Sequence, residues 1–353
     1  YDEVQRIISQ QILKSGRRVD GRALEDIRPL GGEVGLLPRT HGSGLFMRGE
    51  TQVLSTVTLA GPGAAQIVDT MDLDIKKSYM HHYSFPPFSV GETRPLRGPG
   101  RREIGHGALA EKALISVLPS KEKFPYVIRV TSDTLGSNGS SSMGSVCGST
   151  LALMDAGVPI LAPVAGVAVG LASVSDMSTW KVFTDLQDLE DGKGGMDFKI
   201  AGTAQGITAI QLDTKTIGLS MDIVTEAFRQ AKQGRLRILD VLKSAIATPR
   251  PDLSKYAPRI ESFYVKPDRI RDIIGPGGKM INEIIDKTGV DIDIDDSGLV
   301  VITSKSADGM RQAVEWVRSL TAEVEVGKTY HGTVTRLMDF GAFVEVLPKQ
   351  EGL

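Results

Sequence analysis

The chain has 353 residues, of which 41% are hydrophobic and 24% are charged, and its formal net charge is −2. This length is enough for two or three domains of an ordinary soluble globular protein. The single cysteine excludes a disulfide framework and a cysteine-rich zinc site, and it fits a reducing compartment. Cys147 falls on the apolar face of a predicted helix, which indicates a buried structural thiol and not a nucleophile.

The ends of the chain and its longest apolar run bear on targeting. The run VPILAPVAGVAVGLA is interrupted by Pro163 and several glycines and is short for a membrane span, so it predicts a buried strand region. No secretory or targeting segment is visible at the start. The chain opens without methionine and ends on KQEGL in mid-pattern. We therefore expect it to be a piece of a longer protein.

Apolar periodicity predicts the following elements in chain order. A helix over residues 1–15 precedes an α/β region over 16–248, and a proline-rich linker over 249–258 follows that region. The strand patterns are TQVLSTVTLAG, FPYVIRVTS, VAGVAVGLAS, MDFKIAG and ITAIQLD. Further helices are expected over 102–118, 141–156 and 221–247.

The tract SNGSSSMGSVCGST, residues 137–150, joins a predicted strand to a predicted helix. A flexible linker and a plain helix N-cap are two interpretations of such small polar residues. The third is an anion site, because free backbone N–H groups and the positive end of the helix dipole favour a phosphate there. We favour the anion site, although no Gly-Lys-Ser/Thr follows, so this is not a Walker A loop.

Two loops of the α/β region carry opposite charge. The basic loop TRPLRGPGRRE contains Arg94, Arg97, Arg101 and Arg102. The acidic loop TDLQDLEDGKGGMD contains Asp185, Asp188, Glu190, Asp191 and Asp197. On one domain these loops suit a phosphate-bearing substrate together with a divalent metal. A solvated surface turn is the alternative for each loop taken alone.

Residues 259–322 show a strand, two helices separated by GPGG, two strands and a final helix. This βααββα order with a G-x-x-G loop resembles a KH RNA-binding domain. The glycines at 275, 277 and 278 let a nucleic-acid backbone approach closely, and Lys279 supplies charge. The alternative is an ordinary glycine turn between helices. His81 and His82, in the preceding α/β region, are given no catalytic role.

Residues 325–353, with VGKTYHGTVTRLMDFGAFVEV, resemble the opening of an S1 RNA-binding domain, an OB-fold that would need further strands. Phe340 and Phe343 would offer a surface for stacking bases, with Arg336 near for phosphate. The alternative is that both phenylalanines belong to the barrel core.

The combination of these two units with GRREIGHG, SNGSSSM, MDFK, RGETQVL, HHYSFPPFSVGE and LALMDAGVP resembles the polynucleotide phosphorylase family along essentially the whole chain. The matching part is the C-terminal half. The resemblance implies an α/β (α+β) chain. Its parts are a linker helix (1–15), a second ribonuclease-PH-like catalytic domain (16–248; ribosomal protein S5 domain 2-like fold), a linker (249–258), a KH α+β domain (259–322) and the first strands of an OB-fold (325–353).

The resemblance also implies an activity: phosphorolytic 3′-to-5′ degradation of RNA to nucleoside diphosphates, reversible as template-independent polymerisation, with a role in mRNA turnover. Inorganic phosphate is the co-substrate, and the metal is Mg²⁺ or Mn²⁺. The partners implied are single-stranded RNA 3′ ends, two further copies in a homotrimer, and an RNA-degradation complex with an endonuclease or helicase. No membrane or DNA partner is expected, and the location is the bacterial cytoplasm or an organelle.

Site residues carry over from the family motifs. Ser140, Ser141 and Ser142 would hold the attacking phosphate, and Arg101, Arg102 and His106 would contact RNA. Asp191, Asp197 and Lys199 would form the catalytic set, with the two aspartates also holding the metal. Two alternatives stay open: a hydrolytic metal-dependent exoribonuclease and a noncatalytic RNA-binding ring subunit.

Overall fold

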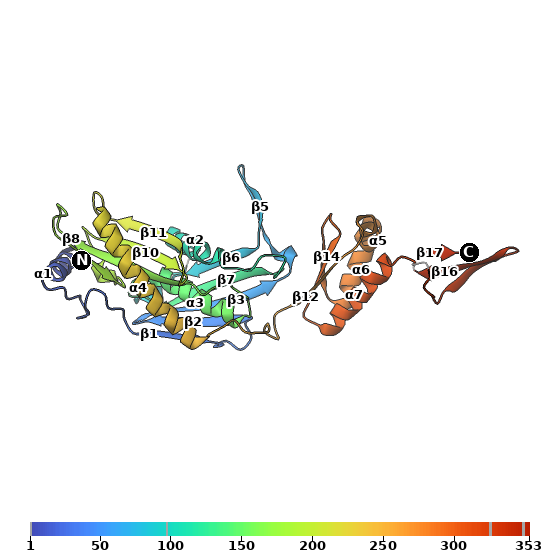
Figure 1. Cartoon of the computed structure of the whole chain (residues 1–353), viewed down its shortest axis with the longest axis horizontal. Coiled ribbons are helices and arrows are strands. Elements are labelled where there is room, and N and C mark those ends of the chain that lie inside the picture. Colours follow the sequence, from blue (N-terminus) through green and yellow to red (C-terminus); the bar gives the residue numbers. More distant parts are fainter. Residues whose placement is uncertain (1, 97, 325–326, 348–349) are drawn as a thin grey trace. The chain divides into compact units, whose positions relative to one another are not determined.

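The computed structural model describes residues 2–96, 98–324, 327–347 and 350–353 (Figure 1). Arg97 of the basic loop and Glu325 at the start of the S1-like stretch fall outside these residues. The chain divides into two compact units. The second comprises Ala257–Leu353 together with two short segments, Ala60–Gln66 and Pro125–Val127. None of the described helices is long and apolar enough to cross a membrane.

Two sheets form the body of the first unit. The five-stranded sheet has the order β1 (Leu30–Val34), β2 (Gly42–Arg48), β3 (Thr51–Ala60), β7 (Val127–Gly136) and β6 (Tyr79–Ser84). The four-stranded sheet has the order β11 (Ile207–Thr214), β10 (Met196–Gly202), β8 (Ala165–Ser173) and β9 (Trp180–Thr184). The second sheet is antiparallel, whereas β6 and β7 of the first pair in parallel. Every residue of β8 is buried, which confirms the strand predicted for the long apolar run.

Helix α3 (Ser141–Asp155) packs against β1 and β2 of one sheet and β8 and β10 of the other. All of its residues are buried, including Cys147, and burial raises the pKa of that thiol to about 11. Small residues permit this close packing. A Cβ atom on Gly44 of β2 would lie 2.7 Å from the Ala152 nitrogen. The helix is thus the centre of the unit, and the predicted structural role of the cysteine agrees with its surroundings.

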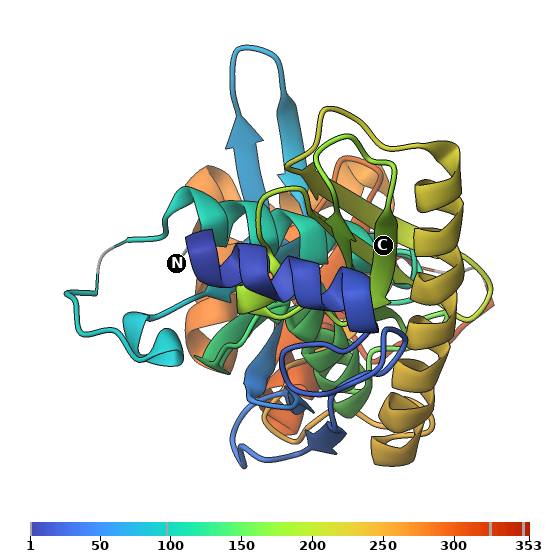
Figure 2. The same cartoon turned by 90° about the vertical axis from the view of Figure 1, so that its left-hand side faces the viewer.

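Three further helices cover the sheets (Figure 2). Helix α1 (Asp2–Ser15) packs on β8, α2 (Arg101–Ile115) packs on β6, and α4 (Met221–Ala245) packs on β8, β9 and β1. All three were predicted. The largest difference is at α2, which was expected to continue to residue 118. Between the larger elements lie the 3₁₀ turns η1 (Pro62–Ala64), η2 (Pro87–Val90) and η3 (Asp188–Glu190).

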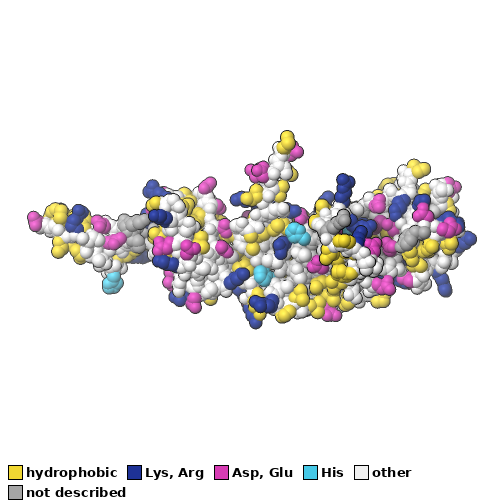
Figure 3. Space-filling view, turned by 180° about the vertical axis from the view of Figure 1, so that it is seen from behind, with side chains coloured by type: hydrophobic (Ala, Val, Ile, Leu, Met, Phe, Trp, Pro, Cys, Tyr) yellow, Lys and Arg dark blue, Asp and Glu magenta, His cyan; other side chains and the backbone are white. Residues whose placement is uncertain are grey.

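A hairpin of β4 (Gln66–Asp69) and β5 (Asp74–Lys77) projects from the body as two thin strands (Figures 1 to 3). Its side chains are mostly exposed, and Met71 at the turn is fully so. The sequence interpretation did not include this hairpin, because its strands are short and charged.

The second unit contains the predicted βααββα order. It comprises β12 (Arg259–Tyr264), η4 (Pro267–Arg269), α5 (Ile270–Ile274), η5 (Pro276–Gly278), α6 (Lys279–Thr288), β13 (Asp291–Ile294), β14 (Leu299–Ser304) and α7 (Ala307–Thr321). The strands form an antiparallel sheet in the order β12-β14-β13. Apolar residues of α5, α6 and α7 pack against this sheet in one core that includes Ile273, Ile284 and Val317.

The same unit ends in a three-stranded meander of β15 (Thr333–Met338), β16 (Gly341–Leu347) and β17 (Gln350–Gly352). The DFGAF stretch joins β15 to β16, as expected. Phe340 is 69% exposed and Phe343 is half-buried, with the Arg336 guanidinium 4.5 Å from its ring centroid. Phe340 is therefore not a core residue of the described meander.

Candidate active site

The serine loop, residues 137–140, connects β7 to α3, and side chains of β2 and β3 donate hydrogen bonds to its carbonyl groups. The Arg48 guanidinium donates to the Ser140 carbonyl at 2.7 Å, and the Thr51 hydroxyl donates to the Gly139 carbonyl at 3.0 Å. Gly139 and Ser140 both adopt positive φ, at 81° and 60°. The flexible-linker interpretation is therefore wrong.

Hydroxyl groups of the serines gather at the start of α3. Ser140 makes no side-chain cap hydrogen bond, so the plain N-cap interpretation is also wrong. Within the described residues, the buried Oγ atoms of Ser140 and Ser142 have no hydrogen-bond partner. Ser141 Oγ accepts from the Tyr83 hydroxyl at 2.7 Å. Two unpartnered hydroxyls beside the free N–H groups of a helix N-terminus are groups that suit an anion.

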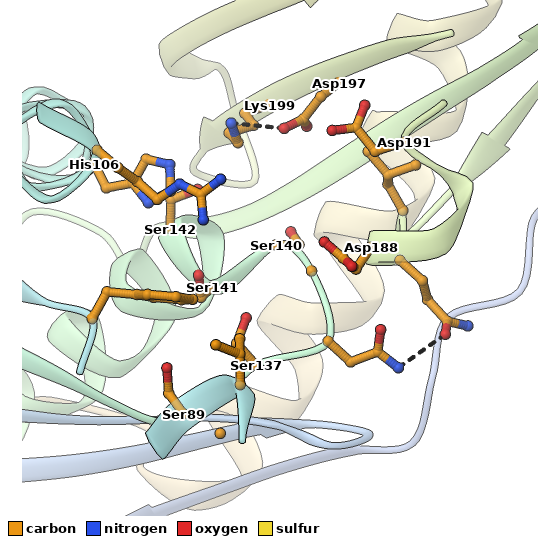
Figure 4. A pocket seen from close by; sticks show the side chains of 18 of the residues that line it. Ser89, His106, Ser137, Ser140, Ser141, Ser142, Asp188, Asp191, Asp197 and Lys199 are labelled. Carbon is orange, nitrogen blue, oxygen red and sulfur yellow. Dashed lines mark hydrogen bonds and ion pairs between the residues drawn. The ribbon is translucent and has the colours of Figure 1, made fainter. Parts of the chain in front are cut away.

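Acidic side chains approach the same place from β10 of the second sheet and from the turn η3 (Figure 4). Asp197 and Lys199 lie on the same face of β10, as their two-residue spacing predicted, and their charged groups are 2.7 Å apart. Asp191 follows η3, and its carboxylate lies 2.7 Å from Lys215 Nζ. Burial raises the pKa of Asp197, while Lys199 opposes the shift and Asp191 adds to it.

Arg102 and His106 come from the first two turns of α2. The Arg102 guanidinium lies 5.7 Å from the centroid of the Phe85 ring. The His106 ring packs edge-on against Tyr83, with centroids 5.2 Å apart. Burial, followed by the charges of Lys199 and Arg102, lowers the pKa of His106 to about 4. His106 is therefore a neutral imidazole at pH 7.

Most of the predicted site residues line one cavity of about 610 Å³. The predicted residues that it brings together are Ser140, Ser141, Ser142, Arg102, His106, Asp191, Asp197 and Lys199. Arg101 does not line it, although it is the neighbour of Arg102 and begins α2; its side chain is exposed. Although the two arginines are adjacent in the sequence, Arg102 lines the cavity and Arg101 does not.

The sequence interpretation missed several cavity residues. They include Phe85, directly after β6, together with Asn138, Gln187 and Asp213. Asp213 lies directly opposite Asp197 in the β10–β11 ladder. In the sequence, only the alternation of apolar and polar residues in ITAIQLD indicated on which face of the strand Asp213 lies. The Tyr83–Ser141 contact spans 58 residues and left no local signal.

The two carboxylates fit a divalent cation as an incomplete ligand set. Asp197 Oδ1 is buried and has no hydrogen-bond partner among the described residues. Yet no group of three or more His, Cys, Asp or Glu side chains in the described part of the chain is arranged to hold a metal. Mg²⁺ commonly takes one or two carboxylates and completes its shell with water and substrate phosphate. The residues present suit that mode.

In the second unit, the GPGG loop has positive φ at Gly275, Gly277 and Gly278. A Cβ atom on Gly277 would meet nothing within 4 Å, so the loop backbone is open to an approaching molecule. Lys279 begins α6 directly after it. This is the geometry that the KH interpretation expects of a backbone clamp.

Family comparisons agree with these two units. Residues 26–159 match the 3′ exoribonuclease family, domain 1, also called RNase PH, and residues 260–319 match the KH domain. A chain in the structure of the Archaeoglobus fulgidus exosome with RNA bound to the active site superimposes with a TM-score of 0.55 at 15% identity. It covers 68% of this chain and 97% of that one, which supports the ribonuclease-PH-like fold.

Curated relatives are similar over a longer stretch. The polyribonucleotide nucleotidyltransferase of Moorella thermoacetica is 58% identical over 347 residues, 98% of this chain and 46% of that protein. The enzyme of Desulfitobacterium hafniense is 57% identical over 352 residues, 100% of this chain and 48% of that protein. The chain thus spans about half the length of the curated relatives it matches. It joins a ribonuclease-PH-like domain to a KH domain, and over its whole length it is similar to about half of a bacterial polyribonucleotide nucleotidyltransferase.

Proposed function

We propose that the chain carries the active site of a phosphorolytic 3′-to-5′ exoribonuclease, which uses inorganic phosphate to release nucleoside diphosphates from RNA and runs in reverse as a polymerase. One observation carries the proposal. An anion site with two unpartnered serine hydroxyls faces Asp197 and Lys199 across a single cavity. A hydrolase has no need for a second anion site, because its nucleophile is water.

Each residue has a role in the proposed reaction. The serine loop and the N-terminus of α3 bind and orient inorganic phosphate. A phosphate oxygen attacks the last internucleotide phosphorus, and the bond from this phosphorus to the 3′-oxygen of the preceding nucleotide breaks. Arg102 and Lys199 offset the negative charge that accumulates as two phosphates meet. Asp197 is placed to protonate the departing 3′-oxygen.

Asp191 and Asp197 would hold Mg²⁺ or Mn²⁺. When bound, such an ion supplies Lewis-acid polarisation of the scissile phosphate. His106, being neutral, contributes a hydrogen bond to RNA and no charge. Arg101 would contact RNA outside the cavity, since its side chain is exposed beside Arg102.

The finer assignments rest on the family resemblance. We propose that residues 16–248 are the second ribonuclease-PH-like domain of a longer protein, that 259–322 are the KH domain, and that 325–353 begin an S1 domain. The KH loop and the exposed Phe340 would capture single-stranded RNA. A homotrimer, an RNA-degradation complex with an endonuclease or helicase, a role in mRNA turnover and a cytoplasmic location belong to the same proposal.

The test uses the full-length protein that contains this chain, with Mg²⁺ and an RNA bearing a single-stranded 3′ tail, incubated with and without inorganic phosphate. The released nucleotide is identified by chromatography. Diphosphates that form only with phosphate support phosphorolysis. Monophosphates formed without phosphate indicate hydrolysis, and tight RNA binding without any release indicates a noncatalytic binding subunit.

A further inference from the structure

Behind the serine loop lies a group of mostly buried charges that the proposed chemistry does not use. Its centre is Asp185, which is fully buried and adopts a positive φ of 62°. We call this group the arginine cluster; its members are Arg18, Arg22, Arg28, Arg48, Asp20, Asp185 and Glu190. Arginine is rarely buried without a specific reason, and Arg18 and Arg48 are each no more than 1% exposed.

The cluster links both loops of the active site through Asp185. Its carboxylate lies 2.7 Å from Arg28 Nη2 and 3.0 Å from Arg48 Nε. The other ends of these guanidinium groups donate to the serine loop. Arg28 donates to the Asn138 carbonyl at 2.6 Å, and Arg48 donates to the Ser140 carbonyl at 2.7 Å. Two guanidinium groups therefore bridge a single carboxylate to the phosphate site.

Asp185 itself belongs to the acidic loop. The Asp185 carbonyl accepts from Arg18 Nη2 at 2.6 Å, and Arg18 is ion-paired with Glu190 in η3. The two loops also touch directly, because Asn138 Nδ2 donates to Gln187 Oε1 at 3.1 Å. The position of the serine loop relative to Asp191 is thus set by the cluster and not by the sheets alone.

The cluster also carries net charge. Among its buried members, the three guanidinium groups of Arg18, Arg28 and Arg48 face the two carboxylates of Asp185 and Glu190, which leaves one positive charge in a buried environment. Buried charges are screened less than exposed ones, so this charge acts on an anion bound at the serine loop. A neutral support of the same shape would lack this effect.

We propose, building on the phosphorolytic function above, that Arg28, Arg48 and Asp185 are positioning residues. They hold the serine loop in register with the acidic loop and place a buried positive charge behind the bound phosphate. The charge contributes to phosphate affinity, and the guanidinium forks contribute to alignment and therefore to turnover.

Two variants of the full-length protein distinguish the contribution of the charge to phosphate affinity from the contribution of the guanidinium forks to turnover. Arg48→Gln removes charge and fork, and we expect the KM for inorganic phosphate to rise at least fivefold while the KM for RNA stays within twofold. Arg48→Lys keeps the charge, so we expect a smaller change in phosphate KM together with a kcat at least fivefold lower. Arg235→Gln is the matched control. Arg235 is also buried and donates to a backbone carbonyl, but that carbonyl belongs to Thr203, which lies outside both the serine loop and the acidic loop.

The proposal is overturned if Arg48→Gln leaves the phosphate KM within twofold of wild type. It is also overturned if the KM for phosphate and the KM for RNA rise together, or if the phosphate KM rises no more than it does in Arg235→Gln. An unchanged kcat in Arg48→Lys removes the alignment role. If Arg48→Gln does not fold, as judged by thermal denaturation, Arg28→Gln takes its place with the same expectations.

Phosphate binding is also titrated directly by ³¹P NMR with inorganic phosphate, without RNA. If wild-type protein binds phosphate but releases no diphosphate, the proposed function fails, and the cluster is judged by whether Arg48→Gln weakens this binding at least fivefold. If wild-type protein is phosphorolytic and the titration of the variant matches it, the role of the cluster fails alone.

Discussion

The contact between the serine loop and the acidic loop leads to a specific prediction for Gly139→Ala. Gly139 has a φ of 81°, and a Cβ atom there would lie 2.9 Å from both the Asp188 nitrogen and the Leu186 carbonyl oxygen. Both contacts are backbone atoms, which cannot turn aside as a flexible side chain does. To reach an ordinary separation of 3.4 Å, the two loops must move apart by about 0.5 Å.

The expected effect has two parts. A left-handed conformation costs an alanine about 1–2 kcal/mol, which lowers Tm by roughly 2–8 °C in a domain of this size. The displacement acts on turnover. Since a misplacement of about 1 Å costs roughly 100-fold in rate, about 0.5 Å corresponds to a roughly tenfold lower kcat.

Gly16→Ala provides the control. Gly16 follows α1 with a φ of 69°, and its Cβ atom would meet only the flexible end of Lys181 at 3.6 Å. It therefore carries the conformational cost without separating the loops. Both variants are assayed for diphosphate release at saturating phosphate and RNA, and for Tm. A kcat for Gly139→Ala equal to that of Gly16→Ala would refute the reasoning.

Three further predictions concern single groups. Asp197→Asn should lower phosphorolysis by about 10²–10⁴-fold while the Kd for RNA stays within about twofold; retained turnover would remove Asp197 from its catalytic role. For His106, whose pKa falls from 6.5 to about 4, the unfolded state binds more protons between these values. Stability should therefore decrease as the pH is lowered through this window, by up to about 3 kcal/mol from His106, and urea unfolding of His106→Gln should show a shallower slope, to which the buried His81 still contributes. Gly277→Asp combined with Gly278→Asp should raise the Kd for RNA at least tenfold, because charge is placed against the phosphate backbone. Gly289→Asp, at a φ of 67° in the same unit and with open space around it, is the control, and equal RNA affinities would contradict a clamp at the GPGG loop.

Much of the fold was predictable because it rests on local periodicity. The helices α1, α3 and α4 and the KH order all follow from apolar spacing and glycine punctuation. The Asp197–Lys199 pair followed from the two-residue repeat of a strand and is confirmed at 2.7 Å. Each of these inferences needs only residues that are close in the sequence.

The arginine cluster could not be predicted in this way. Arg28 and Asp185 are 157 residues apart, and Arg18 and Glu190 are 172 apart. Each looks like an ordinary surface charge until the fold supplies its partner. The left-handed conformation of Ser140 was also missed; its carbonyl accepts from Arg48, which lies on a strand distant in the sequence. The sequence also did not indicate that Arg102 lines the cavity while its neighbour Arg101 is exposed at the start of α2.

The complete burial of α3 has a consequence for amide hydrogen exchange. Amides in the middle of this helix are hydrogen-bonded and enclosed by two sheets, so they exchange only through global unfolding and should be among the slowest in the chain. The first-turn amides at Ser141 and Ser142 have no partner within the helix and border the cavity, so they should exchange far faster. Slowly and rapidly exchanging amides of one helix thus lie about one turn apart, and added phosphate should slow only the second group.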